Sequence, residues 1–142
     1  MRLWNLQGNL ITQFEAHLGV TDVAFNREGD MIVSSGRDDS TLKLWNLEGS
    51  LVSDPFKGHT RAVSSVAISS DGRTIVSGGA DNTVQLWDWQ DDLISKPFEG
   101  HSNGIFSVTA NNQTIVSGGE DGLIRLWNYT GESTDELREG QD

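Results

Sequence analysis

The sequence predicts an all-β protein built from one unit of about forty residues that recurs along the chain. The histidines are spaced by 42 and 42 residues, the phenylalanines that precede them by 42 and 42, and four tryptophans by 41, 42 and 40. These residues are His17, His59, His101, Phe14, Phe56, Phe98, Trp4, Trp45, Trp87 and Trp127. Short apolar runs separated by turn residues fill each unit, and no window shows helical spacing of comparable quality.

Each unit predicts four antiparallel strands. An alternating apolar run follows each histidine, at 20–25, 63–68 and 105–110. After a turn comes a second run, at 31–35, 74–78 and 114–118, and after another turn rich in Asp, Asn and Gly comes a third run that ends in tryptophan. The fourth segment ends in phenylalanine, and in two copies it carries a proline, Pro55 or Pro97. Because proline cannot donate to a strand ladder, this segment is expected at the outer edge of its sheet.

The chain begins inside a unit, because RLWNL at 2–6 matches KLWNL at 43–47. We therefore expect spare third and outer strands at 1–14, a first repeat at 15–57, a second at 58–99, and a third at 100–130 that lacks a clear outer strand. Residues 131–142 are acidic and hold a single apolar anchor, Leu137. They form either a degenerate outer strand or a disordered tail, and the tail is favoured.

The second unit carries the pairs that identify the repeat, Gly58-His59 at its start and Trp87-Asp88 at its end. With these pairs the chain resembles the WD-repeat (tryptophan–aspartate) β-propeller family from residue 2 to about 129. The resemblance implies four-stranded blades arranged about a central axis. The sequence departs from the family pattern in turns only: asparagine follows the other three tryptophans, and Ala16 replaces the glycine before His17.

Each unit also contains a histidine, a serine and an aspartate, the ingredients of a nucleophilic triad. A structural network is favoured instead, because three active sites in one small domain would be unusual and no G-x-S-x-G motif exposes a serine. The resemblance implies a buried tetrad in each blade that ties three strands together. Its members are His59, Ser77, Asp81, Trp87; His101, Ser117, Asp121, Trp127; and His17, Ser35, Asp39, Trp45, with Ser34 and Asp38 as alternatives in the first copy.

Composition limits the classes of partner that the chain is expected to bind. The formal net charge of −11 disfavours nucleic acid and anionic membranes. No segment is apolar enough to cross a membrane, and the first residues lack the features of a signal peptide. The chain has no cysteine, which suits a reducing compartment, and we expect a cytoplasmic location. No phosphate-binding or dinucleotide motif is present, and histidines on separate blades cannot converge on one zinc ion, so no cofactor or metal is expected.

The resemblance implies a protein–protein interaction scaffold that presents loops on a rigid body, and we expect no enzymatic activity. The loops on the family's usual docking face contain Arg37, Asp38, Arg61, Ala80, Asn103 and Glu120. Trp89 has no indole counterpart in the other units, and the sequence leaves two roles open for it, a partner contact or a cover for its own blade.

Three blade equivalents are too few for a ring, since propellers have four to eight blades. We expect the spare outer strand, with Leu10 and Phe14, to complete the last blade of another copy. A dimer with six blades is preferred to a trimer with nine. The alternative is that the chain is a C-terminal piece of a larger WD-repeat signalling or scaffold protein.

Overall fold

The computed structural model describes residues 1–89 and 93–138. These residues form thirteen β-strands and no helix, which confirms the prediction of an all-β protein. The strands are β1 (Arg2–Trp4), β2 (Leu10–Gln13), β3 (Val20–Phe25), β4 (Met31–Gly36), β5 (Thr41–Asn46), β6 (Phe56–Lys57), β7 (Val63–Ile68), β8 (Ile75–Gly79), β9 (Val84–Trp87), β10 (Ile105–Ala110), β11 (Ile115–Gly119), β12 (Leu123–Trp127) and β13 (Ser133–Arg138).

The strands form separate antiparallel sheets, each built from strands in chain order. The first blade is β3-β4-β5-β6, the second is β7-β8-β9, the third is β10-β11-β12-β13, and β1-β2 is a half-blade. The outer edge of the second blade is irregular: segment 93–98 meets β9 through the isolated bridges Val84↔Phe98 and Trp87↔Leu93, and Ile94 donates its backbone N–H to Leu86 O at 3.1 Å. Pro97 lies in this segment, and β6, which follows Pro55, is only two residues long.

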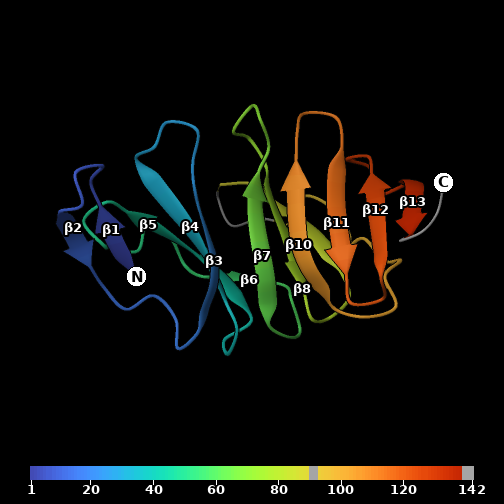
Figure 1. The fold of residues 1–142 in the computed structure, drawn as a ribbon, viewed down its shortest axis with the longest axis horizontal. Coiled ribbons are helices and arrows are strands. Elements are labelled where there is room, and N and C mark those ends of the chain that lie inside the picture. Colours follow the sequence, from blue (N-terminus) through green and yellow to red (C-terminus); the bar gives the residue numbers. More distant parts are fainter. Residues whose placement is uncertain (90–92, 139–142) are drawn as a thin grey trace.

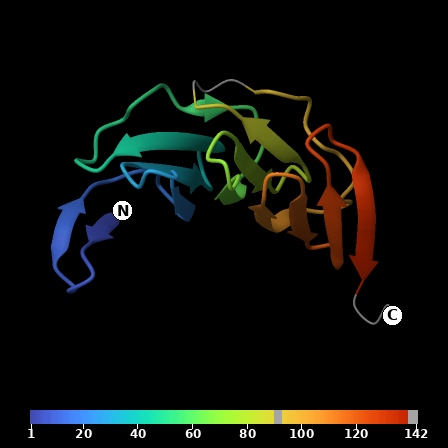
Figure 2. The same cartoon turned by 90° about the horizontal axis from the view of Figure 1, so that it is seen from above.

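The blades stand side by side in an open arc. Figure 2 shows inner strands β3, β7 and β10 on the concave side, with the β1-β2 pair and β13 at opposite tips of the arc. Figure 1 shows the half-blade next to the first blade and the third blade at the far end. Because the arc does not close, one face of the third blade and part of one face of the first blade have no neighbouring sheet within residues 1–89 and 93–138.

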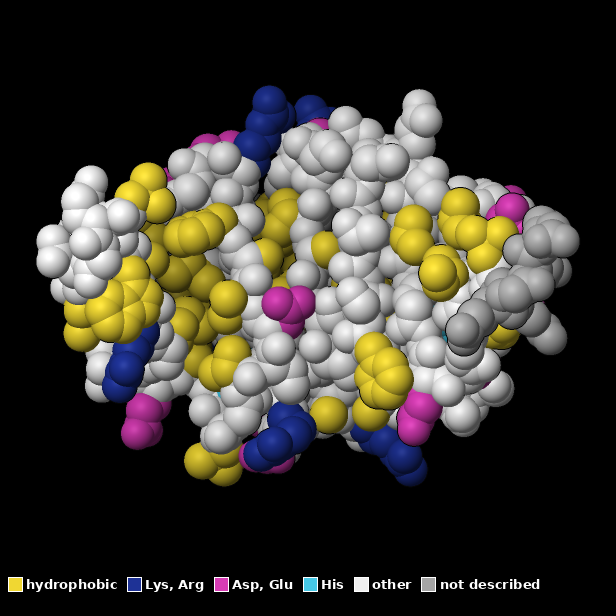
Figure 3. Space-filling view, viewed as in Figure 1, with side chains coloured by type: hydrophobic (Ala, Val, Ile, Leu, Met, Phe, Trp, Pro, Cys, Tyr) yellow, Lys and Arg dark blue, Asp and Glu magenta, His cyan; other side chains and the backbone are white. Residues whose placement is uncertain are grey.

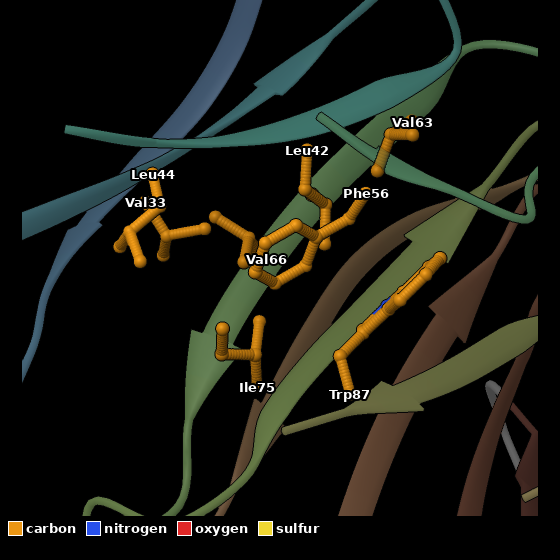
Figure 4. Packing of buried hydrophobic residues seen from close by; sticks show 8 residues of the cluster. All are labelled: Val33, Leu42, Leu44, Phe56, Val63, Val66, Ile75 and Trp87. Carbon is orange, nitrogen blue, oxygen red and sulfur yellow. The ribbon is translucent and has the colours of Figure 1, made fainter. Parts of the chain in front are cut away.

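The cores lie between blades, so each blade has two apolar faces. We call the face toward the preceding blade the leading face and the opposite one the trailing face. Figure 4 shows the core in which the trailing face of the first blade meets the leading face of the second. Its members are Val33, Leu42, Leu44 and Phe56 on one side and Val63, Val66, Ile75 and Trp87 on the other. An equivalent core joins the second and third blades through Val76, Val84, Leu86, Phe98, Ile105, Val108, Ile115 and Trp127.

The expectation of a disordered tail at 131–142 is wrong for residues 131–138. β13 pairs with β12 along its length, with Ile124 opposite Leu137. The turn before it explains why: Asn128 Oδ1 accepts hydrogen bonds from the backbone N–H groups of Thr130 and Glu132, both at 3.0 Å, and Gly131 has a φ of 89°. Asn46 organises its turn in the same way, so asparagine after the tryptophan fixes the route into the outer strand. The rest of the predicted tail, residues 139–142, lies outside the described part of the chain.

Two glycines at the same position in successive blades test the blade-to-blade packing. A Cβ on Gly78 would lie 2.6 Å from Ile105 Cγ2 and 2.8 Å from Val108 Cγ1, whereas a Cβ on Gly118 would meet no atom within 4 Å. We therefore expect Gly78→Ala to lower the free energy of unfolding by about 1–3 kcal/mol through overpacking. Gly118→Ala, the matched control, should cost much less. Urea denaturation of dilute protein measures both, and equal losses would contradict the described interface.

Candidate functional site

The histidine, serine, aspartate and tryptophan of each blade form a chain of hydrogen bonds. In the second blade, His59 Nδ1 lies 2.9 Å from Asp81 Oδ2, His59 Nε2 lies 2.7 Å from Ser77 Oγ, and the Trp87 indole donates to Ser77 Oγ at 2.9 Å. The third blade repeats these contacts at 3.0, 2.7 and 2.8 Å, with His101, Asp121, Ser117 and Trp127. The chain links the loop before the inner strand to the second strand, a turn and the third strand.

The direction of each hydrogen bond follows from the chemistry of the groups. An ionised carboxylate only accepts, so His59 Nδ1 carries the proton donated to Asp81. The other ring nitrogen, Nε2, then accepts from the Ser77 hydroxyl, whose oxygen accepts in turn from the Trp87 indole. The connectivity is that of a hydrolase triad, but Ser77 is fully buried and its oxygen is occupied by the indole. A substrate carbonyl has no approach to it, so the tetrad joins strands and is not a nucleophilic centre.

In the first blade the tetrad uses Ser34 where the sequence analysis placed Ser35, and this prediction is wrong. Ser34 Oγ lies 2.8 Å from His17 Nε2 and accepts from the Trp45 indole at 2.8 Å, and Asp39 lies 2.6 Å from His17 Nδ1. The extra residue of this unit sits in the turn after Gly36, so it does not move the serine along its strand. Ser34 pairs with Lys43 as Ser77 pairs with Gln85. Because side chains alternate along a strand, Ser35 points away from His17 and bonds Thr21.

The tetrad aspartates hold their negative charge strongly. Partial burial acts to raise the pKa of Asp81, but hydrogen bonds from His59, Thr83 and Thr60 outweigh it and lower the pKa to about 2. Asp39 shows the same balance, with His17 and Thr41 as donors and a pKa of about 2. These carboxylates therefore stay ionised, as acceptors for the histidine, through the whole physiological range.

The charged and polar residues predicted for docking are exposed, whereas Ala80 and Trp89 are half-buried, and the described part of the chain does not bring them into a common pocket. Arg61, Asn103 and Glu120 lie in separate loops on one rim of the arc. Arg37 pairs with its own neighbour, with Nε 3.1 Å from Asp38 Oδ1. Asp38 also lines a shallow cavity of about 340 Å³ beside the first tetrad, together with Glu15, Ala16, His17, Leu18, Asp39 and Lys43. Ala80, between them on the same rim, donates its backbone N–H to Ala62 O at 2.8 Å.

Trp89 covers its own blade, which decides between the two roles that the sequence left open. Its indole donates to Gly72 O at 2.6 Å, across the turn between β7 and β8, and its ring packs against the core between the first and second blades. Tyr129 takes the same position in the third blade and donates to Asn111 O. These side chains cover the ends of their blades at the turn between the first and second strands.

Within one chain, β13 occupies the outer edge of β12, the edge at which the outer strand of another copy was expected. β2 pairs with β1, with Leu10 opposite Trp4, and Phe14 stacks on Trp45 with ring centroids 4.9 Å apart. The ring centroids of Phe56 and Trp87 lie 5.7 Å apart, and those of Phe98 and Trp127 lie 5.6 Å apart. In each case the outer-strand phenylalanine packs against the tryptophan of the next blade. Phe14 is therefore part of the core of the first blade and is not spare.

The residues that sequence reasoning missed lie on the two open faces at the tips of the arc. Figure 3 shows hydrophobic side chains gathered over β1–β4 at one end and over β11–β13 at the other. At the first end, Val23 and Phe25 are exposed and line an apolar cavity of about 130 Å³ with Met1, Arg2, Leu3, Ala24 and Ile32. At the other end the trailing face of the third blade presents Val116, Ile124, Leu126 and Leu137. Matching each apolar position to its copies in the other units would have found both sets.

Within residues 1–89 and 93–138, no three His, Asp or Glu side chains are grouped to hold a metal ion. The same residues contain no helix with the length and apolar character needed to cross a membrane.

The sequence model of the family described as "WD domain, G-beta repeat" matches three segments, residues 8–46, 49–88 and 93–128. The chain belongs to the WD-repeat family. Each match begins in an outer strand and ends in the third strand of the next blade, so one WD repeat spans two blades, as the Phe–Trp pairs do. WD repeats generally serve as scaffolds for interactions between proteins. Among curated proteins, none matches this sequence.

Substitution of two adjacent serines in the first blade tests which of them belongs to the tetrad. Ser34→Ala leaves the Trp45 indole and His17 without their shared partner in a buried site, so we expect a loss of about 1–3 kcal/mol in the free energy of unfolding. Ser35→Ala removes a contact with Thr21, which keeps a second acceptor in Val63 O, so the loss should be smaller. Thermal unfolding followed by circular dichroism measures both. A larger loss for Ser35→Ala would restore the assignment made from the sequence.

The low pKa of Asp81 predicts how stability depends on pH. The folded-state pKa of about 2 lies below the ordinary value of 3.8 for an aspartate. The ionised carboxylate therefore stabilises the fold above about pH 4, and this contribution is lost as the pH falls toward 2. We expect Asp81→Asn to be less stable than the wild type at pH 7 and the difference to shrink between pH 5 and pH 2. Urea unfolding at several pH values measures this. The exposed Asp54→Asn is the control, and a constant difference for Asp81→Asn would refute the linkage.

Proposed function

We propose that this WD-repeat protein is a non-catalytic scaffold whose first partner is another copy of itself, recruited to the open faces of the arc. The observation that carries the proposal is a difference in burial between equivalent residues. Val63 and Val66 on the leading face of the second blade are 0% and 5% exposed, whereas Val20 and Val23 on the leading face of the first are 41% and 49% exposed. The leading face of the first blade thus exposes residues whose counterparts in the second blade are buried by a neighbouring sheet.

The trailing face of the third blade has the composition that such a neighbour needs. Its Val116, Ile124 and Leu126 correspond to Val76, Val84 and Leu86, which are buried against the third blade. Gly118 supports the comparison further. The equivalent Gly78 is required by the close approach of Ile105 and Val108, whereas a Cβ on Gly118 would meet no atom of the described residues within 4 Å. The trailing face of the third blade thus has the residues needed to pack against a further sheet.

Because the two open faces differ and complement each other, the association is head-to-tail, which closes into a ring when the rotation per chain allows it. Three blades per chain give six blades for two copies and nine for three. Six lies within the usual range for propellers, so a dimer is preferred. The same faces would be covered by adjoining sequence if the chain is part of a longer WD-repeat protein, and the two cases differ in the solution mass.

Further partners would meet the rim of exposed loops that contains Arg37, Asp38, Arg61, Asn103 and Glu120. A rigid set of blades positions these loops, and binding residues commonly lie on loops held in this way. The net charge of −11 favours partners with a basic surface, because charge complementarity speeds encounter and excludes acidic competitors.

The solution mass, measured by light scattering, tests self-association. We expect a multiple of the 15.5 kDa chain for the wild type and a shift toward the single chain for Val23→Glu, which places a charge on the open leading face. Val52→Glu is the matched control, because Val52 is also 49% exposed but lies away from both open faces, in the segment before β6. A wild type with the mass of one folded chain would refute the proposal.

A further inference from the structure

Head-to-tail docking of two complete arcs meets a steric conflict at the first blade. The outer half of its leading face is already covered by the half-blade, whose Leu3 and Phe14 pack with Ile32 and Trp45. Leu86 and Phe98 of the second blade cover Ile115 and Trp127 of the third blade in the same way. Ile115 and Trp127 correspond to Ile32 and Trp45 of the first blade. The β12-β13 hairpin of an incoming third blade would need the place that β1-β2 holds. One of the two hairpins must therefore leave.

The two competing strands are identical in sequence where they pair. Residues 2–5 read RLWN, and residues 125–128 read RLWN. β12 bonds to β11 with Ile115 opposite Trp127, Val116 opposite Leu126 and Ser117 opposite Arg125. β1 has the residues to pair with β11 in the same register as β12. The edge of β1 opposite β2 pairs with no strand among the described residues.

We infer that copies assemble by exchange of hairpins: β1-β2 of one copy pairs with β11 of the next copy and displaces the β12-β13 hairpin, which acts as an internal placeholder. The inference rests on the proposed self-association and specifies its contacts. In the shared blade, Ile115 lies opposite Trp4, Val116 opposite Leu3, and Ser117 opposite Arg2.

The exchanged blade satisfies the groups that the isolated arc leaves exposed. Val116, opposite Leu3, enters the apolar cavity of about 130 Å³ between β1 and the first blade, as Val33 opposite Leu44 enters the core of Figure 4. Trp4, 52% exposed in the single chain, takes the position of Trp127, with Ser117 of the other copy as the acceptor for its indole. The loss of Trp127 from the core is thus matched by the gain of Trp4, and the covering of Val20 and Val23 is additional.

The β12-β13 hairpin leaves more easily than the half-blade. Phe14 stacks on Trp45, whereas the corresponding position of β13 holds the smaller Leu137, which would make a poorer cover for Trp45. β13 also brings two acidic residues, Asp135 and Glu136, of which Glu136 forms an ion pair with Arg125 at 3.1 Å. An exchange that keeps Phe14 in place therefore retains the larger aromatic contact.

Engineered cysteine pairs test the exchange in the full-length chain, which has no cysteine of its own. In the variant Leu3→Cys/Val116→Cys the two thiols lie at opposite tips of one arc but become directly opposed between copies, within the Cα separation that a disulfide bridges. We expect oxidation to give covalent multiples of the 15.5 kDa chain on non-reducing gels. The single variants Leu3→Cys and Val116→Cys are the controls and should give few such species.

The variant Val116→Cys/Leu126→Cys instead fixes β12 to β11 within one copy. Oxidation should convert the assembly to single chains, and a reductant should restore it. If the wild type associates but the first pair does not cross-link and the second does not dissociate the assembly, the exchange is refuted while self-association stands. If the wild type is a single chain at every concentration, both proposals fail.

Discussion

The structure depends on one constraint: each blade is a sheet with two apolar faces, and only another blade can cover either of them. The cores therefore lie between sheets, and polar contacts cross the same boundaries. Asp22 Oδ2 accepts from Ser65 Oγ and from the backbone N–H of Val66, both at 3.0 Å, and Ser65 Oγ accepts from the Val108 N–H at 3.2 Å. These bonds link the three inner strands in series. Each blade thus supports the next, and stability at any position relies on the presence of a neighbour.

Most of the fold follows from the sequence because the constraint repeats. A period near forty residues, set by His, Phe and Trp together, is enough to place the strands of each blade and their order. The tetrads of the second and third blades lie where the repeat puts them. Asp81 follows Ser77 by four positions, and Asp121 follows Ser117 by the same four positions. What repeats in sequence without insertion repeats in space, because the turns and ladders on both sides are the same.

The failures occur where a local feature overrides the repeat. An extra residue in the turn after Gly36 left Ser34 and Ser35 equivalent by spacing, and only the alternation of side chains along β4 separates them. Composition suggested disorder for β13, but a strand at a sheet edge is held by backbone hydrogen bonds, which composition does not record. The role of Trp89 depends on the position of Gly72 O, a contact between a side chain and a carbonyl that no residue pattern announces.

The incomplete tetrad at the start of the chain bears on specificity. Trp4 corresponds to Trp45, Trp87 and Trp127, yet it has no serine partner among the described residues, in which β1 pairs with β2 alone. A polypeptide that completes this blade must supply an apolar side chain opposite Leu3 and a serine hydroxyl within reach of the Trp4 indole. The apolar requirement alone would tolerate many strands in several registers. The hydrogen bond between the serine and the Trp4 indole fixes the register of the added strand. A shift by one residue would turn the serine to the opposite face of the sheet and leave the indole unpaired.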